Sequence, residues 1–384
     1  MINIKTMNKI AKIGLDELDK TIFNIADDAE APEGIMVRSA SLHDMEFNAE
    51  LNAIVRCGAG VNNIPTVECA QQGIVVFNTP GANANGVKEL TIASLLLASR
   101  KITDGINWAN TLESDVAKQV EKGKSAFGGC EIQGKTLGVI GLGAIGGLVA
   151  NAAKSLGMKV IGCDHFLTVA AAWHLSRSIN KASTYDEVYK EADYISLHIP
   201  SPPDTRGMIN AEAISKMKDG VKIVNLSRAD LVNVADIKEA LASGKVSCYV
   251  TDFPTEDTIN YPGIITTPHL GASTGESEDY CAVMAAHQLQ DFLLYGNIKH
   301  SVNYPDIDMP KTTESRLVIL HKNVPNVISS VTGKVSAAGI NIDHMANRSK
   351  GDYAVMIVDT PDEVSEAAIK DIAELENVIR VIKI

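Results

Sequence analysis

The stretch GKTLGVIGLGAIG, residues 134–146, decides the fold of this chain. Within it, the apolar run 136–140 leads directly into Gly141, Gly143 and Gly146, and a segment with helical spacing follows. This strand, glycine-rich turn and helix are typical of a dinucleotide-binding turn. The first glycine permits the tight turn, the second lets the backbone approach a pyrophosphate, and the third lets the helix pack against the strand.

An acidic residue lies at the distance along the chain that a dinucleotide-binding turn requires. Asp164 ends the next apolar run, close to the spacing of about 20 residues that the pattern requires. Its carboxylate can accept hydrogen bonds from ribose hydroxyls and would repel a 2′-phosphate, so we expect NAD rather than NADP. The N–H groups of Ala144 and Ile145, at the start of the helix, would face the pyrophosphate.

The chain around this turn alternates between short runs rich in Val and Ile and longer segments with helical spacing. That alternation predicts a doubly wound parallel sheet of the Rossmann type. A smaller α/β unit precedes it, and the helical segment 278–295 is placed to return the chain to that first unit, so the cofactor domain is expected to be an insertion. The predicted strands are 35–40, 53–56 and 75–78 in the first unit, and 136–140, 159–163, 194–199, 222–226, 247–251 and 264–267 in the second.

A polar stretch with two prolines separates these units from a last domain. Its pattern is βαββαβ, with strands expected at 317–320, 340–346, 353–359 and 378–384, which predicts two helices on one face of an antiparallel sheet. The expected domains are a substrate-binding domain at 1–97 and 284–305, an NAD-binding domain at 98–283, a linker at 306–314 and a C-terminal domain at 315–384.

Composition excludes several classes of protein. The formal net charge of −12 with scattered Lys and Arg argues against a nucleic-acid partner. The six cysteines form no CxxC pair, so neither a metal site nor a disulfide framework is expected. The first residues show no signal-peptide pattern, and no apolar run is long enough to span a membrane, so we expect a cytoplasmic protein.

Three polar residues follow successive strands of the predicted sheet. Arg228 and Asp252 follow the fourth and fifth strands, and His269 follows the sixth. Ligands of such sheets bind beyond the carboxyl ends of the strands, so these side chains could converge on one crevice. Oxidation of a secondary alcohol needs a base, which we predict to be His269, with Arg228 holding a substrate carboxylate.

The motifs NLSRADLV (225–232), TDFPTED (251–257) and PHLGAST (268–274) resemble those of the D-2-hydroxyacid dehydrogenases. The resemblance covers nearly the whole chain and is strongest to the D-3-phosphoglycerate dehydrogenases of that family. It implies a flavodoxin-like substrate domain, oxidation of 3-phosphoglycerate with NAD as the entry to serine biosynthesis, substrate binding by Arg228 and acid/base catalysis by His269. It also implies cofactor contacts by Pro200, Asp252 and Gly271, with Asp252 holding the nicotinamide carboxamide.

The chain departs from the family pattern beside the catalytic arginine. Ala229 and Asp230 replace paired glycines, and the loop that leads to His269 is short. An ungapped count from Arg228 places the carboxylate that assists His269 at Asp257, whereas residue type favours Glu256. We predict Glu256 and keep Asp257 as the alternative.

The first unit carries candidate substrate ligands. Arg38 and Arg56 can match a phosphate, and the glycine-rich turn with Gly58 and Gly60 can hold a carboxylate. Lys124 is a third candidate, and the resemblance implies substrate contacts at these positions, less securely at Lys124. The stretch NTPGANANGVKELT (78–91) resembles the segment that shapes the cleft and hinge, with Asn83 and Glu89 in structural roles.

The C-terminal domain resembles an ACT domain. His321, Asn323 and Asn341 have the spacing seen in serine-sensing phosphoglycerate dehydrogenases, which implies L-serine as an effector. Asn326 replaces the glycine that usually follows the proline there, and the alternative is an ACT domain that only mediates assembly.

The segment 88–109 resembles the family's dimerisation arm and predicts a homodimer or homotetramer; the alternative is an ordinary buried helix. Two other functions stay open: a different 2-hydroxyacid dehydrogenase or glyoxylate/hydroxypyruvate reductase, and a binding protein that senses NAD. The apolar residues of the proposed arm are Leu90, Leu95, Leu96, Leu97, Ile102 and Ile106.

Overall fold

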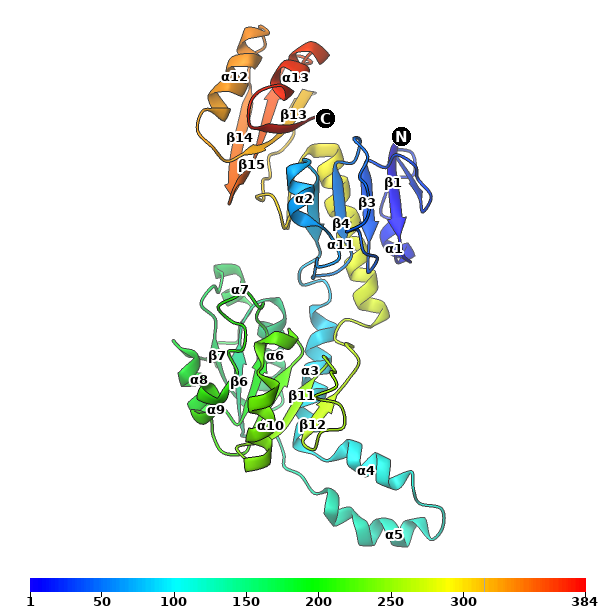
Figure 1. The fold of residues 1–384 in the computed structure, drawn as a ribbon, viewed down its shortest axis with the longest axis vertical. Helices are drawn as coiled ribbons and strands as arrows, with labels where there is room; N and C mark the ends of the chain where they lie inside the picture. The colour runs from blue at the N-terminus through cyan, green and yellow to red at the C-terminus, as the bar shows by residue number, and fades with distance from the viewer. Residues whose placement is uncertain (314) are drawn as a thin grey trace. The chain divides into compact units, whose positions relative to one another are not determined.

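A computed structural model describes residues 1–313 and 315–384 of the chain. These residues form two compact units, Met1–Asn83 with Gly275–Ile384 (unit 1) and Ala84–Thr274 (unit 2), which Figure 1 draws as ribbons. The chain of unit 2 is thus inserted in unit 1, as predicted, and the α/β fold class with a C-terminal antiparallel domain is confirmed. The finer domain bounds stay a prediction, and that of the linker, 306–314, extends to residue 314, outside the described residues.

Unit 2 is built on a parallel sheet of seven strands in the order β12-β11-β10-β9-β6-β7-β8. The strands of a sheet covered on both faces have few polar residues, and the four residues of β9 are all buried. The strands are β6 (Thr136–Ile140), β7 (Lys159–Cys163), β8 (Asn180–Lys181), β9 (Tyr194–Leu197), β10 (Val221–Asn225), β11 (Val246–Thr251) and β12 (Ile264–Thr266).

Short helices connect these strands and cover the sheet (Figure 1). Several begin at a side chain that accepts an N–H bond, as Asn233 does for α10, so their starts follow directly from the local sequence. The helices are α6 (Ala144–Ser155), α7 (Val169–Trp173), α8 (Tyr185–Glu191), α9 (Ala211–Ser215) and α10 (Val234–Ser243), with a 3₁₀ turn at Ala229–Leu231.

The predicted arm is not one continuous apolar stripe. Helix α3 (Ala84–Ser99) packs against α6 and buries Leu95, so this part is an ordinary covered helix. Beyond Arg100 the chain forms two further helices that bury no residue, and Ile106 is 54% exposed there. Both this outer part and Leu96 of α3, 41% exposed, offer apolar surface for a second subunit, and the arm stays a prediction. The outer part comprises α4 (Ile102–Ala109), α5 (Val116–Gly123) and a 3₁₀ turn at Lys124–Phe127.

Unit 1 contains a parallel five-stranded sheet in the order β2-β1-β3-β4-β5, the flavodoxin-like order. The first two strands were not predicted, because β1 reads INIKTM and alternates polar with apolar residues at a half-exposed position. The long helix α11 (Gly275–Tyr295) packs on this sheet, three residues longer than the predicted 278–295. The elements are β1 (Ile2–Met7), α1 (Lys12–Leu15), β2 (Phe23–Ala26), β3 (Gly34–Val37), β4 (Ala53–Arg56), α2 (Thr66–Gln71) and β5 (Val75–Asn78).

The C-terminal part of unit 1 is an antiparallel sheet in the order β14-β15-β13-β16 with two helices, the expected βαββαβ arrangement. The predicted strand at 340–346 is wrong in position, because the strand is His344–Lys350. Its polar sequence at the exposed edge hides the strand, and Asn341 instead donates to Asp343 in the preceding turn, at 3.1 Å. The elements are β13 (Ser315–Lys322), α12 (Val327–Ala337), β14 (His344–Lys350), β15 (Tyr353–Thr360), α13 (Glu366–Ala373) and β16 (Val378–Lys383).

The two central strands of this ACT-like sheet, β13 and β15, are buried on both faces. Leu317 and Ile319 of β13 pack with the residues of α12 and α13 in one core. Val318 and Leu320, which point the opposite way, belong to the core that contains Ile4 and other residues of the parallel sheet. Alternate residues of a strand point to opposite faces, so the ACT-like sheet lies between its own helices and the substrate-binding part of unit 1.

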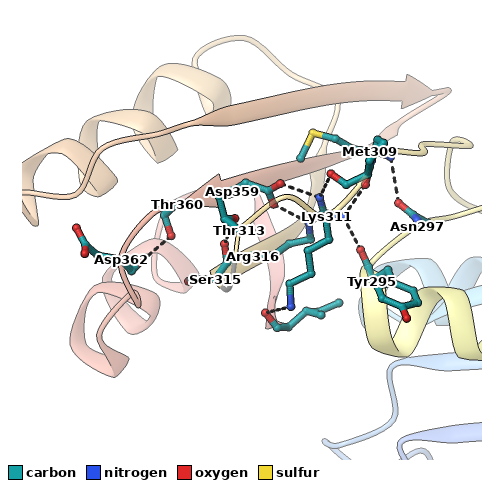
Figure 2. Close-up of polar contacts among 12 residues, drawn as sticks. Tyr295, Asn297, Met309, Lys311, Thr313, Ser315, Arg316, Asp359, Thr360 and Asp362 are labelled. Atoms are coloured by element: carbon teal, nitrogen blue, oxygen red, sulfur yellow. Dashed lines mark hydrogen bonds and ion pairs between the residues drawn. The ribbon is translucent and has the colours of Figure 1, made fainter.

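A buried arginine ties this sheet to the chain that precedes it (Figure 2). Arg316 and Asp359 are both 0% exposed, and Nε and Nη2 of the arginine donate to the two carboxylate oxygens at 2.6 and 2.8 Å. The remaining guanidinium hydrogens reach the main-chain carbonyls of Tyr295, Met309 and Pro310 at 2.7, 2.8 and 3.0 Å. All five donors of the guanidinium are therefore used.

No helix among the described residues combines the length and apolar character needed to cross a membrane.

Arg316→Met should lower the thermal unfolding midpoint strongly, because it leaves the Asp359 carboxylate buried and unpaired at a cost of about 3–5 kcal/mol. The double variant Arg316→Met with Asp359→Leu should recover part of that loss, since no buried charge remains. Lys383→Met, which breaks exposed ion pairs, is the matched control and should cost under about 1 kcal/mol. Calorimetry that shows equal losses for Arg316→Met and Lys383→Met would contradict this role.

Candidate active site

The glycine-rich turn between β6 and α6 can adopt its backbone conformation only because Gly141 and Gly146 carry no side chain. Gly141 has φ of +89°, and a Cβ there would lie 2.4 Å from the carbonyl oxygen of His198. A Cβ on Gly146 would lie 1.9 Å from the carbonyl oxygen of Gly141, whereas a Cβ on Gly143 would meet nothing within 4 Å. The turn is thus closed on the protein side and open where Gly143 faces outward, as a bound pyrophosphate requires.

His198 supports this turn from behind. Its backbone N–H donates to Ile140, and its ring shares a hydrogen bond of 2.8 Å with the Ser196 hydroxyl. Burial lowers the pKa of His198 to about 4, so the ring is neutral near pH 7. This geometry gives His198 a structural role. Elsewhere in the chain, His165 packs edge-on against Tyr185, His287 pairs with Glu17 and His174 is exposed.

The Asp164 carboxylate lies at the end of β7, next to the turn. One oxygen accepts the Leu142 N–H of the turn and the other the Phe166 N–H, each at 2.8 Å. The carboxylate is therefore held at the position where the ribose of a dinucleotide would lie.

Arg228 stands at the end of β10 in a loop organised by a buried asparagine. The Asn225 side chain donates to the Arg228 carbonyl at 2.8 Å and accepts the N–H groups of Ser227 and Arg228. The Ser227 hydroxyl donates to Ile199 at 2.6 Å. These two residues were not predicted as positioning groups, although both lie in the motif NLSRADLV. The Arg228 side chain is exposed, and its Nη1 donates to the Ser227 carbonyl at 2.7 Å, so its other donors face outward for an anionic substrate.

His269 follows β12 in a strained backbone conformation, with φ of +44°. Its N–H is shared between the carbonyls of Asp252 and Thr267, both at 3.0 Å. The imidazole packs edge-on against the Phe253 ring, with centroids 5.1 Å apart. A positive φ is unfavourable for residues other than glycine. The two hydrogen bonds from its N–H hold the His269 backbone in this conformation and so fix the direction of its side chain, as is common at active sites.

Asp252 is 1% exposed, and one of its oxygens has a partner, the Gly271 N–H at 3.4 Å. The other oxygen, Oδ1, is buried without any. Burial raises the pKa of Asp252, and the nearby His269 opposes that shift. An unmet buried acceptor suits an amide donor such as the nicotinamide carboxamide, so the residues present fit NAD.

The predicted contact between a carboxylate and the His269 side chain is absent among the described residues. Asp257 pairs instead with Lys238, at 2.7 Å, and is held by that contact. Glu256 is exposed and makes no hydrogen bond with the described residues. Neither carboxylate bonds to His269 among those residues, so the assignment to Glu256 stays a prediction.

The two arginines of unit 1 lie together. The Arg56 Nε donates to the Arg38 carbonyl at 3.1 Å, and Arg38 forms an ion pair of 2.6 Å with Glu278. Gly58 has no side chain where the Arg56 guanidinium passes, since a Cβ there would lie 1.6 Å from Nη1. The half-buried Gly60 follows in the same turn. The structure thus brings Arg38, Arg56 and the glycine-rich turn into one cluster.

The remaining predicted residues are more dispersed. Lys124 belongs to the outer helices of unit 2 and pairs with Glu121 at 2.5 Å, whereas Pro200 lies in the exposed loop after β9. Asn83 has a buried Oδ1 without a partner, and Glu89 accepts from Asn85 at 2.9 Å.

The predicted effector residues do not meet within the chain. His321 is buried, and its ring nitrogens are bonded to Lys322 and Asn347. Asn323 lies beyond the end of β13, while Asn341 precedes β14, whose first residues are level with the start of β13. Asn341 is therefore at the opposite end of the sheet from the other two.

No group of three or more His, Cys, Asp or Glu side chains within the described ranges is arranged to hold a metal ion.

These features define a class: a doubly wound dinucleotide-binding unit with a histidine and an arginine at the strand ends, inserted in a flavodoxin-like unit. A family model described as "D-isomer specific 2-hydroxyacid dehydrogenase, NAD binding domain" matches residues 92–271. The chain belongs to the family of D-isomer specific 2-hydroxyacid dehydrogenases, and the prediction of an NAD-binding domain is confirmed. An "AHAS small subunit-like ACT domain" model matches residues 317–380.

Several curated relatives are named D-3-phosphoglycerate dehydrogenase. D-3-phosphoglycerate dehydrogenase of Escherichia coli (strain K12) is 30% identical over 361 residues, covering 90% of this chain and 85% of the relative. The enzyme of that name from Synechocystis is 31% identical over 366 residues, and that from Mycobacterium leprae 35% identical over 286 residues. The matches cover 92% and 72% of this chain but only 62% and 52% of those two relatives.

Solved structures agree with the fold. NAD⁺-bound 3-phosphoglycerate dehydrogenase of Entamoeba histolytica matches with a TM-score of 0.62 and 27% identity, over 79% of this chain and 98% of that one. A glyoxylate reductase from Paecilomyces matches with a TM-score of 0.65 and 23% identity, over 78% and 98% of the two chains. At that identity the second match supports the fold alone.

Asp164→Ala and Asp164→Asn should separate the two effects of this carboxylate. Both remove the negative charge that repels a 2′-phosphate, so both should shift the preference from NAD toward NADP, by about tenfold or more in Kd. Asp164→Asn keeps an acceptor for Leu142 and should bind NAD better than Asp164→Ala. The measurement is fluorescence titration with NADH and NADPH. An unchanged preference in both variants would remove Asp164 from this role.

Proposed function

We propose that this protein oxidises D-3-phosphoglycerate to 3-phosphohydroxypyruvate with NAD, the first step of serine biosynthesis. The observation that carries the proposal is the constrained His269 beside the buried Asp252, whose free acceptor fits the nicotinamide amide. This pair lies in the NAD-binding domain of the family, and the relatives named D-3-phosphoglycerate dehydrogenase support the choice of substrate.

Bound NAD supplies the acceptor for the hydride that leaves C2 of the substrate. His269 takes the proton of the C2 hydroxyl, and Glu256 assists by stabilising the imidazolium that forms. Arg228 holds the substrate carboxylate through its planar fork of donors and polarises the carbonyl oxygen as it develops. The backbone bonds that fix His269 and Arg228 keep both groups in place before the substrate arrives.

The arginine cluster of unit 1 supplies the phosphate specificity in this proposal. Arg38 and Arg56 carry two positive charges beside the turn with Gly58 and Gly60, whose N–H groups suit a carboxylate. A phosphate dianion would compete with Glu278 for Arg38, since that ion pair is partly exposed and therefore weak. Lys124 is a further phosphate ligand in this proposal, supported only by the family resemblance.

The same residues would also serve a related reaction. Reduction of an unphosphorylated 2-oxoacid is the second candidate function, because Arg228 and His269 would hold and protonate such a substrate in the same way. The cluster of Arg38 and Arg56 favours the phosphorylated substrate over that alternative.

We further propose a homodimer or homotetramer in the cytoplasm. The helices α4 and α5 support the first proposal, because they bury no residue within the chain and expose Ile102 and Ile106. Six free cysteines are consistent with a reducing compartment.

L-serine is the proposed effector, bound between ACT domains of two chains. The separation of Asn341 from His321 and Asn323 supports this arrangement, because two copies can bring opposite ends of the sheet together. His321 already has partners for both ring nitrogens, so the two asparagines would provide most of the ligand contacts.

His269→Asn should lower kcat by about 10²–10⁴-fold, because the proton acceptor is lost while asparagine tolerates the positive φ. The Kd for NADH should stay within about twofold of wild type, since no pyrophosphate contact changes. Steady-state kinetics and fluorescence titration measure the two quantities. His344→Ala, an exposed histidine of β14, is the control. Near-normal turnover in His269→Asn would reject the acid/base assignment.

Arg38→Gln and Arg56→Gln should raise KM for 3-phosphohydroxypyruvate by about tenfold or more, because each removes a charged partner of the phosphate. The KM for an unphosphorylated 2-oxoacid should change far less. Arg177→Gln, an exposed arginine in unit 2, serves as the control and should alter neither value. Equal losses with both substrates would show that these arginines do not recognise the phosphate.

Millimolar L-serine should bind the protein and slow turnover, whereas D-serine should not. Asn341→Ala should abolish this sensitivity and keep the uninhibited rate, since the residue lies in the ACT-like part. Serine must bind the active and inactive arrangements unequally for any inhibition to occur. Calorimetry without a serine signal, together with unchanged rates, would leave the domain with an assembly role only.

A further inference from the structure

A pocket of about 440 Å³ lies in unit 1 where the edge strand β14 meets the substrate-binding part. One side is formed by Arg348 and Lys350, and the other includes Asn78 and the segment from His300 to Asp306. We call it the seam pocket. Its volume falls within the range of about 300–1,000 Å³ for small-molecule sites. It contains none of the residues assigned above to catalysis, cofactor or serine.

Positive groups outnumber negative ones in the seam pocket. Arg348 and Lys350 are charged, His300 adds a ring that can donate, and Asp306 is the acidic residue of the lining. The Lys350 ammonium donates to the Ser301 carbonyl at 2.8 Å and so spans the two sides. One oxygen of Asp306 accepts the Ser301 N–H at 3.4 Å.

The Arg348 side chain lines the seam pocket with its donors unused by the described residues. Across residues 1–313 and 315–384, its guanidinium forms no hydrogen bond and no ion pair. It contrasts with Arg316, whose donors are all used, and with Arg380, which donates to the Leu51 carbonyl and the Asn52 side chain. A free planar fork beside a second cation matches the oxygens of a phosphate group.

The two sides of the seam pocket are held together by contacts that do not depend on a ligand. The Tyr304 ring packs edge-on against Tyr353 of β15, with centroids 5.5 Å apart, and the Tyr304 hydroxyl is fixed on its own side by donating to the Ala70 carbonyl at 2.7 Å. Arg380 of β16 also bonds to the substrate-binding part. Because the walls are fixed in advance, a ligand would lose little free energy in ordering them.

We propose that the seam pocket binds a phosphate dianion, either inorganic phosphate or the phosphate group of a small ester. Arg348 provides the two-pronged contact, Lys350 the second charge and His300 a further donor. The balance of charge favours a dianion, since two cations face one carboxylate before the ligand enters. This site is separate from the arginine cluster of Arg38 and Arg56 and from the proposed serine site.

The test is calorimetric titration of the full chain with inorganic phosphate at constant ionic strength. The background carries Arg38→Gln and Arg56→Gln, which removes the phosphate contacts proposed for the substrate. About one phosphate per chain should bind, and Arg348→Met added to this background should weaken binding about tenfold or more. Lys350→Met should weaken it as well, while Lys370→Met, an exposed lysine of α13, should not.

Two further titrations settle the identity of the ligand. 3-Phosphoglycerate that displaces phosphate would point to an ester, and failure to displace it would point to free phosphate; both agree with a phosphate site. Succinate binding more tightly than phosphate would overturn the proposal in favour of a dicarboxylate. So would the absence of phosphate binding in the background, or equal binding after Arg348→Met. None of these readouts depends on turnover, so the catalytic proposal can fail independently.

Discussion

The close approach of Gly146 to the carbonyl of Gly141 is the constraint on which the cofactor unit depends. Any side chain at Gly146 would overlap that carbonyl, and any side chain at Gly141 would overlap His198. With neither present, α6 begins directly at the end of β6 and its first N–H groups point to the open side of the turn. Asp164 then bonds to the turn itself, so the predicted pyrophosphate and ribose contacts are parts of one rigid loop.

The parallel sheet that contains β6 also positions the residues proposed for catalysis. The strands β10, β11 and β12 are neighbours in register, so Arg228, Asp252 and His269 follow strand ends along one edge of the sheet. Buried side chains, Asn225 and Asp252, determine the loop shapes there, and the exposed Arg228 and His269 are left for the substrate. In unit 1, the buried Arg316–Asp359 pair fixes the ACT-like sheet to the last residue of α11.

Much of the fold could be predicted because its elements differ clearly in periodicity. The strands from β6 to β12 are apolar runs bounded by glycine and polar turns, and apart from the two-residue β8 they lie within about a residue or two of the predicted bounds. β1, β2 and β14 escaped prediction or were misplaced because each is half exposed and contains polar residues. The burial of both faces of the central strands of the ACT-like sheet follows from tertiary packing, which β13 alone does not reveal.

The candidate site could be predicted where few other residue types can fill the role. The glycines of the turn, Asp164, Arg228 and His269 are such cases. The site was less predictable where a role depends on geometry: the support that Asn225 gives to Arg228 and the unmet acceptor of Asp252 appear only in the structure. A count of residues from Arg228 and the residue type favour different carboxylates, Asp257 and Glu256, so the sequence could not choose between them. Asp257 pairs with Lys238 and neither carboxylate bonds to His269 among the described residues, so the choice of Glu256 stays a prediction.

The main proposal is that this chain oxidises a phosphorylated three-carbon 2-hydroxyacid with NAD⁺ and, in reverse, reduces the corresponding 2-oxoacid with NADH. The most direct test compares kcat/KM of the wild-type protein for 3-phosphohydroxypyruvate, 2-oxoglutarate, pyruvate and glyoxylate, with NADH as the reductant. The account predicts the highest value for 3-phosphohydroxypyruvate, by about a factor of 100 if two charged contacts read the phosphate. A higher value for pyruvate or glyoxylate, or no turnover of any of the four, would contradict it.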